Sequence, residues 1–220
     1  MALIRPRFLS CLLASAIALP LPLLAYDTPL SDTAVREAYF LGQRRDETMA
    51  RFLGQYTKAW PQPSSGPHIG SITFLTPFAL LVQYSSRQLD YSAQQAEHDH
   101  HSADEMVTIE VEILLTQNYG PFLTKPTGSP SGSPTGIRLR SPDFWRAATF
   151  RIFDGREEIT VDQIAGEPQY RCSDDGCTLS GATVRIHFPA TTFTSEGATI
   201  EVDPPEGERV VVDFDLAALR

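Results

Sequence analysis

The apolar residues of this chain change their spacing near residue 105, and that change limits the folds open to the chain. Before it, apolar residues recur at intervals of three and four, as along one side of a helix. An example is the set Met49, Phe52, Leu53 and Tyr56. After it, apolar and polar residues alternate over 107–115, as in a strand with one wet face. The sequence therefore predicts an α+β chain, with a helical region at 26–104 followed by an antiparallel immunoglobulin-like β-sandwich at 105–220.

Polar residues stand where three helices of the first region are expected to begin: Ser31 or Asp32, Thr76 and Ser92. Such residues accept hydrogen bonds from the free amides of a first helical turn. Thr76 is followed by proline, which suits the first helical position, and Ser92 by glutamine three residues on, as in a capping box. A further helix is expected from residue 46 to 59. Ile69–Leu75 is short and β-prone, so it predicts a strand within this region.

Short apolar stretches separated by turn residues fill the second region. Asp154-Gly155 is typical of a two-residue turn between paired strands. Residues 125–136 contain only Pro, Thr, Gly, Ser and one lysine, which predicts a flexible loop. Strands at this spacing without intervening helices indicate an antiparallel sandwich.

The first 25 residues predict export. Arg5 and Arg7 precede an apolar stretch at 8–25, and Ala25 supplies the small residue at a cleavage site. A periplasmic or extracellular location follows. Two alternatives are open. One is an uncleaved membrane anchor, which Pro20 and Pro22 disfavour. The other is a lipoprotein modified at Cys11, which is disfavoured because most of the apolar stretch lies after Cys11 instead of before it. No transmembrane segment is expected after cleavage.

The segment after this site resembles the start of uncharacterised exported bacterial proteins. The resemblance covers Tyr26–Ser31 and Arg36–Gly42. It implies export and no particular activity.

The charge of the chain bears on its partners. The chain has 18 basic and 27 acidic residues. Removing 1–25 takes away two basic residues and no acidic ones, which leaves 16 − 27 = −11. Nucleic acids are bound through clustered Lys and Arg, so a nucleic-acid partner is not expected. The expected partner is an envelope protein or ligand of unknown identity.

Cys172 and Cys177 are the two cysteines that remain after cleavage. The residues between them contain an Asp-Gly pair and predict a tight turn that brings the two thiols together across paired strands. In an oxidising compartment a structural disulfide is expected. A redox pair or half of a zinc site is the alternative, but the spacing matches neither motif.

Three of the five histidines lie in the stretch from Glu97 to His101. On a helix, Glu97, His98 and His101 share one side, because residues three and four apart are neighbours. Imidazole and carboxylate ligands at that spacing could hold zinc, nickel or copper. The competing interpretation is a solvated helix end.

Two functions follow from these patterns. Strands and turns are well specified, whereas the spacings of known catalytic motifs are not found. This favours an exported, non-catalytic protein that binds or scaffolds in the cell envelope, without a cofactor. The alternative is a metal-dependent hydrolase or metal-binding protein centred on Glu97, His98 and His101.

Overall fold

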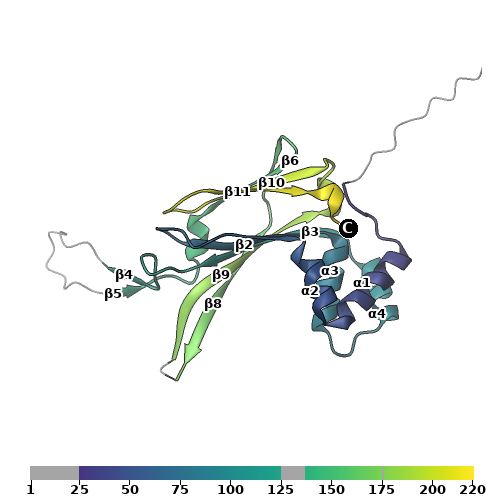
Figure 1. Cartoon of the computed structure of the whole chain (residues 1–220), viewed down its shortest axis with the longest axis horizontal. Coiled ribbons are helices and arrows are strands. Elements are labelled where there is room, and N and C mark those ends of the chain that lie inside the picture. The colour runs from purple at the N-terminus through teal and green to yellow at the C-terminus, as the bar shows by residue number, and fades with distance from the viewer. Residues whose placement is uncertain (1–24, 125–136, 175) are drawn as a thin grey trace, which may run out of the picture.

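The computed structural model of the chain describes residues 25–124, 137–174 and 176–220. Two antiparallel sheets lie one above the other, and four α-helices lie against the far side of one sheet, at one end (Figure 1). The predicted α+β class and antiparallel pairing are confirmed, whereas the immunoglobulin-like arrangement stays a prediction. The predicted loop at 125–136 and all of the predicted signal segment except Ala25 lie outside the described residues.

The larger sheet has five strands in the order β1-β2-β3-β9-β8. Their bounds are Thr57–Ala59 for β1, His68–Leu75 for β2, Met106–Leu114 for β3, Gly176–Pro189 for β9 and Ile164–Ser173 for β8. Ile109 in β3 lies opposite Phe74 in β2 and Ile186 in β9. The alternation of apolar residues seen in the sequence therefore places one face of this sheet in the core.

The second sheet has four strands in the order β11-β10-β6-β7. Their bounds are Val210–Asp215 for β11, Gly197–Asp203 for β10, Thr149–Asp154 for β6 and Glu157–Ile159 for β7. A small separate pair is formed by β4 (Phe122–Thr124) and β5 (Ile137–Leu139). Ile152, Ile200 and Phe214 are buried against the five-stranded sheet, so the two sheets share one core.

The helices are α1 (Asp32–Arg44), α2 (Glu47–Gly54), α3 (Pro77–Arg87) and α4 (Ala93–Ser102). The predicted starts are confirmed: the side chains of Ser31, Thr76 and Ser92 each accept a hydrogen bond from the third amide of the helix that follows. The predicted capping box of α4 is only half formed, because the Gln95 side chain donates a hydrogen bond to Asp99 instead of reaching back to the backbone of Ser92.

The first half of the chain is less helical than the sequence predicts. Strand β2, over the predicted stretch, lies inside the larger sheet, between β1 and β3. The helix predicted at 46–59 is wrong at its end: α2 stops at Gly54, and Thr57–Ala59 pairs with β2 instead. Pairing with an existing strand supplies hydrogen bonds that favour the extended form of these residues over another helical turn.

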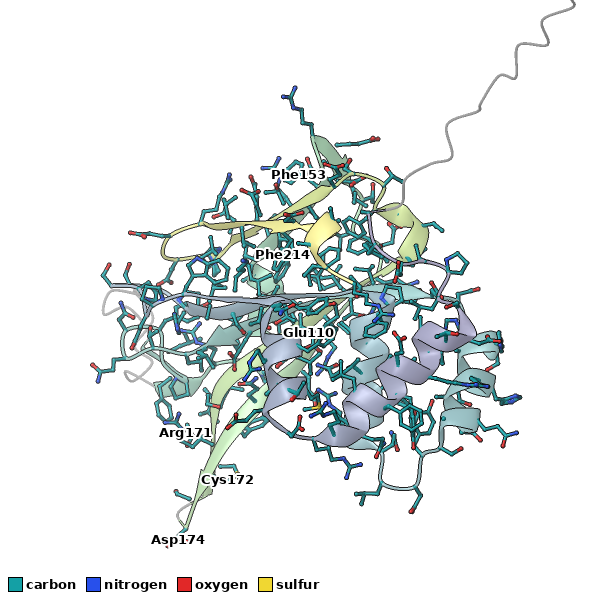
Figure 2. All side chains as sticks on the ribbon, turned by 45° about the vertical axis from the view of Figure 1, so that its right-hand side comes forward. Glu110, Phe153, Arg171, Cys172, Asp174 and Phe214 are labelled. Atoms are coloured by element: carbon teal, nitrogen blue, oxygen red, sulfur yellow. A yellow bond between two sulfur atoms is a disulfide. The ribbon has the colours of Figure 1, made fainter. Side chains whose placement is uncertain are left out.

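The end of the β8–β9 hairpin projects beyond the other strands of the larger sheet (Figure 2). Cys172 and Cys177 lie opposite each other near its end and form a disulfide. Gly176, with φ of 124°, is paired with Ser173. The predicted disulfide is therefore present, and it joins two paired strands.

Both ends of the described chain are held in the body of the protein. The hydroxyl of Tyr26 donates a hydrogen bond of 2.6 Å to the carbonyl of Ala190, and its ring is buried. Arg220 accepts a hydrogen bond of 2.9 Å from Tyr56 on its carbonyl, and its guanidinium lies over the Phe78 ring. These contacts join the sheets to the helices.

Candidate functional site

A groove of about 560 Å³ runs between α3 and α4 and ends at the start of β3. Its apolar surface comes from Pro77, Leu80 and Leu81 of α3 and from Met106. Its polar groups come from Tyr84 and Arg87 of α3, from Tyr91, from α4 and from the residues that follow α4. The groove therefore combines apolar side chains, which we call its floor, with several polar groups, as small-molecule sites usually do.

The sequence of α4 explains why its polar residues reach the groove. Besides Ser102 at the end of the helix, Ala96, Asp99 and His100 line it, and the last two follow Ala96 at three and four residues. This is one side of a helix. Ala96 is fully buried and is the one buried residue of the helix, so it sets the side on which α4 contacts its neighbours. Asp99 and His100 therefore face the groove because Ala96, on the same side of α4, is packed against the neighbouring helices.

Asp99 is held by two neutral donors. Gln95 Nε2 donates a hydrogen bond of 2.6 Å to one of its carboxylate oxygens, and the Tyr91 hydroxyl donates one of 3.1 Å to the other. Burial, together with the hydrogen bond and the charge of Asp99, raises the pKa of Tyr91 above its usual range. Tyr91 thus remains a neutral donor, and neither of these two partners of the Asp99 carboxylate is a cation.

Glu105 fixes the end of the groove. Its carboxylate accepts hydrogen bonds from the amide of Leu30 at 2.6 Å and from the hydroxyl of Thr28 at 2.5 Å. His100 Nε2 lies 3.1 Å from the same carboxylate, and the side chains of His100 and Glu105 are 15% and 11% exposed. One carboxylate therefore joins the segment before α1, the end of α4 and the start of β3.

The residues of the predicted metal site are on another side of α4. Glu97 pairs with Arg36, and His101 Nε2 lies 3.1 Å from Asp32 Oδ1, so both side chains face α1. His98 is exposed to solvent. Within the described residues, no three His, Cys, Asp or Glu side chains gather as a metal site would require. The hydrogen bond to Arg36 is the main cause that lowers the pKa of Glu97.

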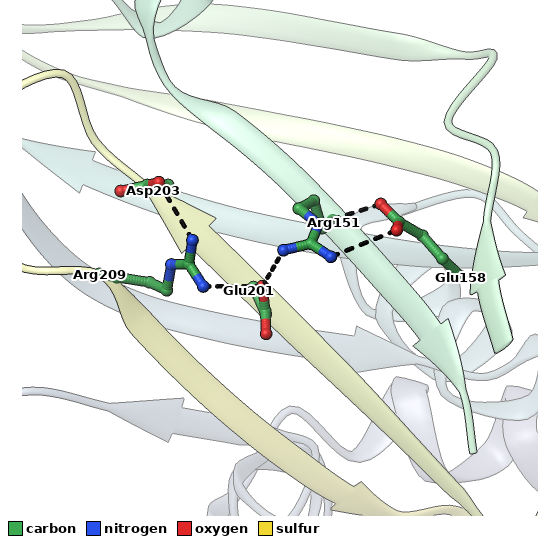
Figure 3. A network of polar contacts seen from close by, with 5 residues as sticks. All are labelled: Arg151, Glu158, Glu201, Asp203 and Arg209. Atoms are coloured by element: carbon green, nitrogen blue, oxygen red, sulfur yellow. Dashed lines mark hydrogen bonds and ion pairs between the residues drawn. The ribbon is translucent and has the colours of Figure 1, made fainter. Parts of the chain in front are cut away.

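A second polar cluster covers the outer face of the four-stranded sheet (Figure 3). Arg151 lies between Glu158 and Glu201, with 3.0 Å from its nitrogens to each carboxylate. Arg209 contacts Glu201 and Asp203 at 3.4 Å. Each guanidinium of this network is matched by carboxylates on neighbouring strands. The network therefore has the form of a solvated, ion-paired sheet face, in contrast to the groove.

Sequence reasoning did not find the groove. It selected the histidines and Glu97, whereas the groove uses Tyr84, Tyr91, Asp99, His100 and Glu105. One signal was present: Ala96 is a small apolar residue in a largely polar stretch, and Asp99 and His100 follow it at three and four residues, on the same side of the helix. The position of α3 beside them was not visible in the sequence.

Comparison with known proteins found no matching family model and no matching curated protein. Within the described residues, none of the helices has the length and apolar character needed to cross a membrane. Function must therefore be argued from the geometry of the groove.

Proposed function

We propose that this is an exported, non-catalytic binding protein of the cell envelope that holds a small ligand in the groove between α3 and α4. The groove itself carries the proposal. Its volume of about 560 Å³ lies within the range of roughly 300–1,000 Å³ that is usual for ligand sites. Its polar groups are oriented by hydrogen bonds to each other, which suits recognition of a ligand.

The disulfide and the anchored Tyr26 support the export part of the proposal. Disulfides persist in oxidising compartments outside the cytoplasm, and Cys172 and Cys177 form one. Tyr26, the first residue after the predicted cleavage site, is buried and hydrogen bonded to Ala190. A chain that begins there would keep this anchor.

Export is tested by expressing the whole chain in a bacterium, separating the cell fractions and sequencing the N-terminus of the purified protein. We expect the protein in the periplasm or medium, with Tyr26 as its first residue. A protein that retains Met1 and stays in the cytoplasm would contradict export.

Binding is tested by ligand-observed NMR with a library of small organic fragments of mixed charge. Ala103→Phe places a ring in the groove and should abolish the binding signals, because Ala103 lines it. Ala165→Phe is the matched control, because Ala165 is exposed on β8, away from the groove. Signals that persist in Ala103→Phe, or no fragment binding at all, would overturn the proposal.

A further inference from the structure

We propose that the ligand of the α3–α4 groove is an organic cation that carries an apolar tail. This inference rests on the proposed function, because it names the chemical class that the same groove selects. Three features of the groove lead to it: an apolar floor, a pair of tyrosine rings, and an excess of carboxylates.

The floor is suited to an alkyl or aryl tail. Pro77 is buried at the start of α3, and Leu80, Leu81 and Met106 are each half-buried. These side chains expose part of their apolar surface to the groove. An apolar tail that covers them would remove that surface from water, which is favourable in proportion to the area covered.

Two tyrosine rings stand beside this floor. Tyr84 is 48% exposed, and its ring lies edge to face with Tyr91, with 5.3 Å between the ring centroids. A cation is attracted to the face of an aromatic ring when it lies within about 6 Å of it. The rings thus offer a position for an alkylammonium group next to the apolar floor.

The charges of the groove favour a positive ligand. Three carboxylates line it, from Asp99, Asp104 and Glu105, against the single guanidinium of Arg87. His100 contacts Glu105. Asp99 receives its hydrogen bonds from the neutral groups of Tyr91 and Gln95, so its charge is oriented but not paired by them. The whole chain has a net charge of −9, which also attracts cations.

The experiment is calorimetric titration of the protein from Tyr26 onward with three probes that share an octyl tail, each below its critical micelle concentration. The probes are octyltrimethylammonium, octyl sulfate and octyl glucoside. We expect the cation to bind at least tenfold more tightly than the other two.

Two variants locate the cation. Tyr84→Ala should weaken binding of the cationic probe by about threefold to thirtyfold, the range of cation–π contacts. Asp99→Asn should weaken it by about tenfold. The matched controls are Tyr170→Ala, because Tyr170 is 51% exposed on β8, and Asp162→Asn, because Asp162 is exposed in the loop after β7. Both controls should leave the affinity unchanged.

The outcomes separate this inference from the function on which it rests. If the anionic or neutral probe binds as tightly as the cation, and Ala103→Phe abolishes that binding, the groove binds ligands but the cationic class is wrong. If Asp162→Asn weakens binding as much as Asp99→Asn, the cation is attracted by net charge alone and the inference is overturned. If none of the three probes binds and the fragment library also gives no signal, the proposed function itself fails.

Discussion

The sheets and the helices of this protein are built on very different amounts of buried apolar surface. Among the described residues, the core between the sheets contains 26 buried hydrophobic residues, whereas the main cluster between the helices contains 7. Helix α2 has no fully buried residue and α4 has only Ala96. The groove lies in the sparsely packed region, where neighbouring helices are held by small residues and polar contacts. The sheets therefore supply most of the stabilising apolar contacts, while the helices leave room for a ligand.

The largest loss of unfolding free energy is expected when an aromatic ring is removed from the core between the sheets. Phe74 is fully buried and contacts the rings of Tyr26, Phe193 and Phe214. Phe74→Ala should lower the free energy of unfolding by about 3–5 kcal/mol. Phe40→Ala, at a side chain that is 61% exposed on α1, should change it by less than about 0.5 kcal/mol. Urea unfolding of both variants measures the difference, and equal losses would contradict the account.

The disulfide is the next largest contribution, and it belongs to the sheets. Replacing both Cys172 and Cys177 by serine should lower the free energy of unfolding by about 2 kcal/mol, because the closed loop is short. Ligand binding in the groove should be unchanged, since the end of the hairpin that carries the disulfide projects away from the helices (Figure 2). Urea unfolding and calorimetric titration of the double variant measure the two effects. A loss of binding would show that the hairpin contributes to the site.

The carboxylate of Asp154, at the end of β6, should make the free energy of unfolding depend on pH. Burial raises the pKa of Asp154. Hydrogen bonds from the amides and hydroxyls of Thr194 and Ser195 together lower this pKa by more, so the net shift is downward. A lowered folded pKa means that the stabilisation is present above the unfolded value of about 3.9 and is lost as pH falls through the folded value. Unfolding free energies measured from pH 6 down to pH 2 should therefore decline in this window.

Asp154→Asn is the variant that isolates this contribution. It should lower the free energy of unfolding by about 1.5 kcal/mol at neutral pH, the cost of weakening hydrogen bonds to a charged group. It should also flatten the decline at acidic pH. Asp213→Asn, at an exposed residue of β11, serves as the control. A decline of the same depth in Asp154→Asn and the wild type would assign the pH dependence to other carboxyl groups.

A smaller effect is expected at the start of α4. Ser92 accepts a hydrogen bond of 3.1 Å from the amide of Gln95, and Ser92→Ala should cost about 1 kcal/mol. Because α4 is anchored by one buried alanine, we expect this loss to appear as faster amide hydrogen exchange within Ala93–Ser102, with β3 unchanged. Equal acceleration in α4 and β3 would mean that the helices and the sheets unfold as one unit.

The smallest effect concerns the predicted metal residues. Because Glu97 and His101 pair with residues of α1 and His98 is exposed, adding Zn²⁺ or Ni²⁺ should leave the unfolding temperature within about 1 °C of the value in chelator. A metal at a hundred times its dissociation constant would stabilise the protein by about 2.7 kcal/mol. A shift of several degrees that is lost in the His98→Ala, His101→Ala double variant would support the metal hypothesis.

The sequence predicted the elements that depend on local signals. The N-caps at Ser31, Thr76 and Ser92 and the pairing of Cys172 with Cys177 follow from short-range hydrogen bonding and turn geometry. The end of α2 did not, because strand β1 forms only when β2 is beside it. Tertiary pairing overrides helix propensity at such positions.

The candidate site could not be predicted for a related reason. The spacing of Glu97, His98 and His101 is a property of one helix, whereas a groove is a property of two. Asp99 and His100 became groove residues because Ala96 is buried against neighbouring helices. Which side of a polar helix faces its neighbour depends on these contacts, and the histidines carried no information about them.

The most direct test of the central claim is a map of amide chemical shifts during titration of the ¹⁵N-labelled protein with octyltrimethylammonium. We expect the large shifts to fall in α3, in α4 and in residues 103–106, with saturation at one ligand per protein. Shifts that gather instead on the outer faces of the two sheets, or that are absent at all concentrations, would contradict it.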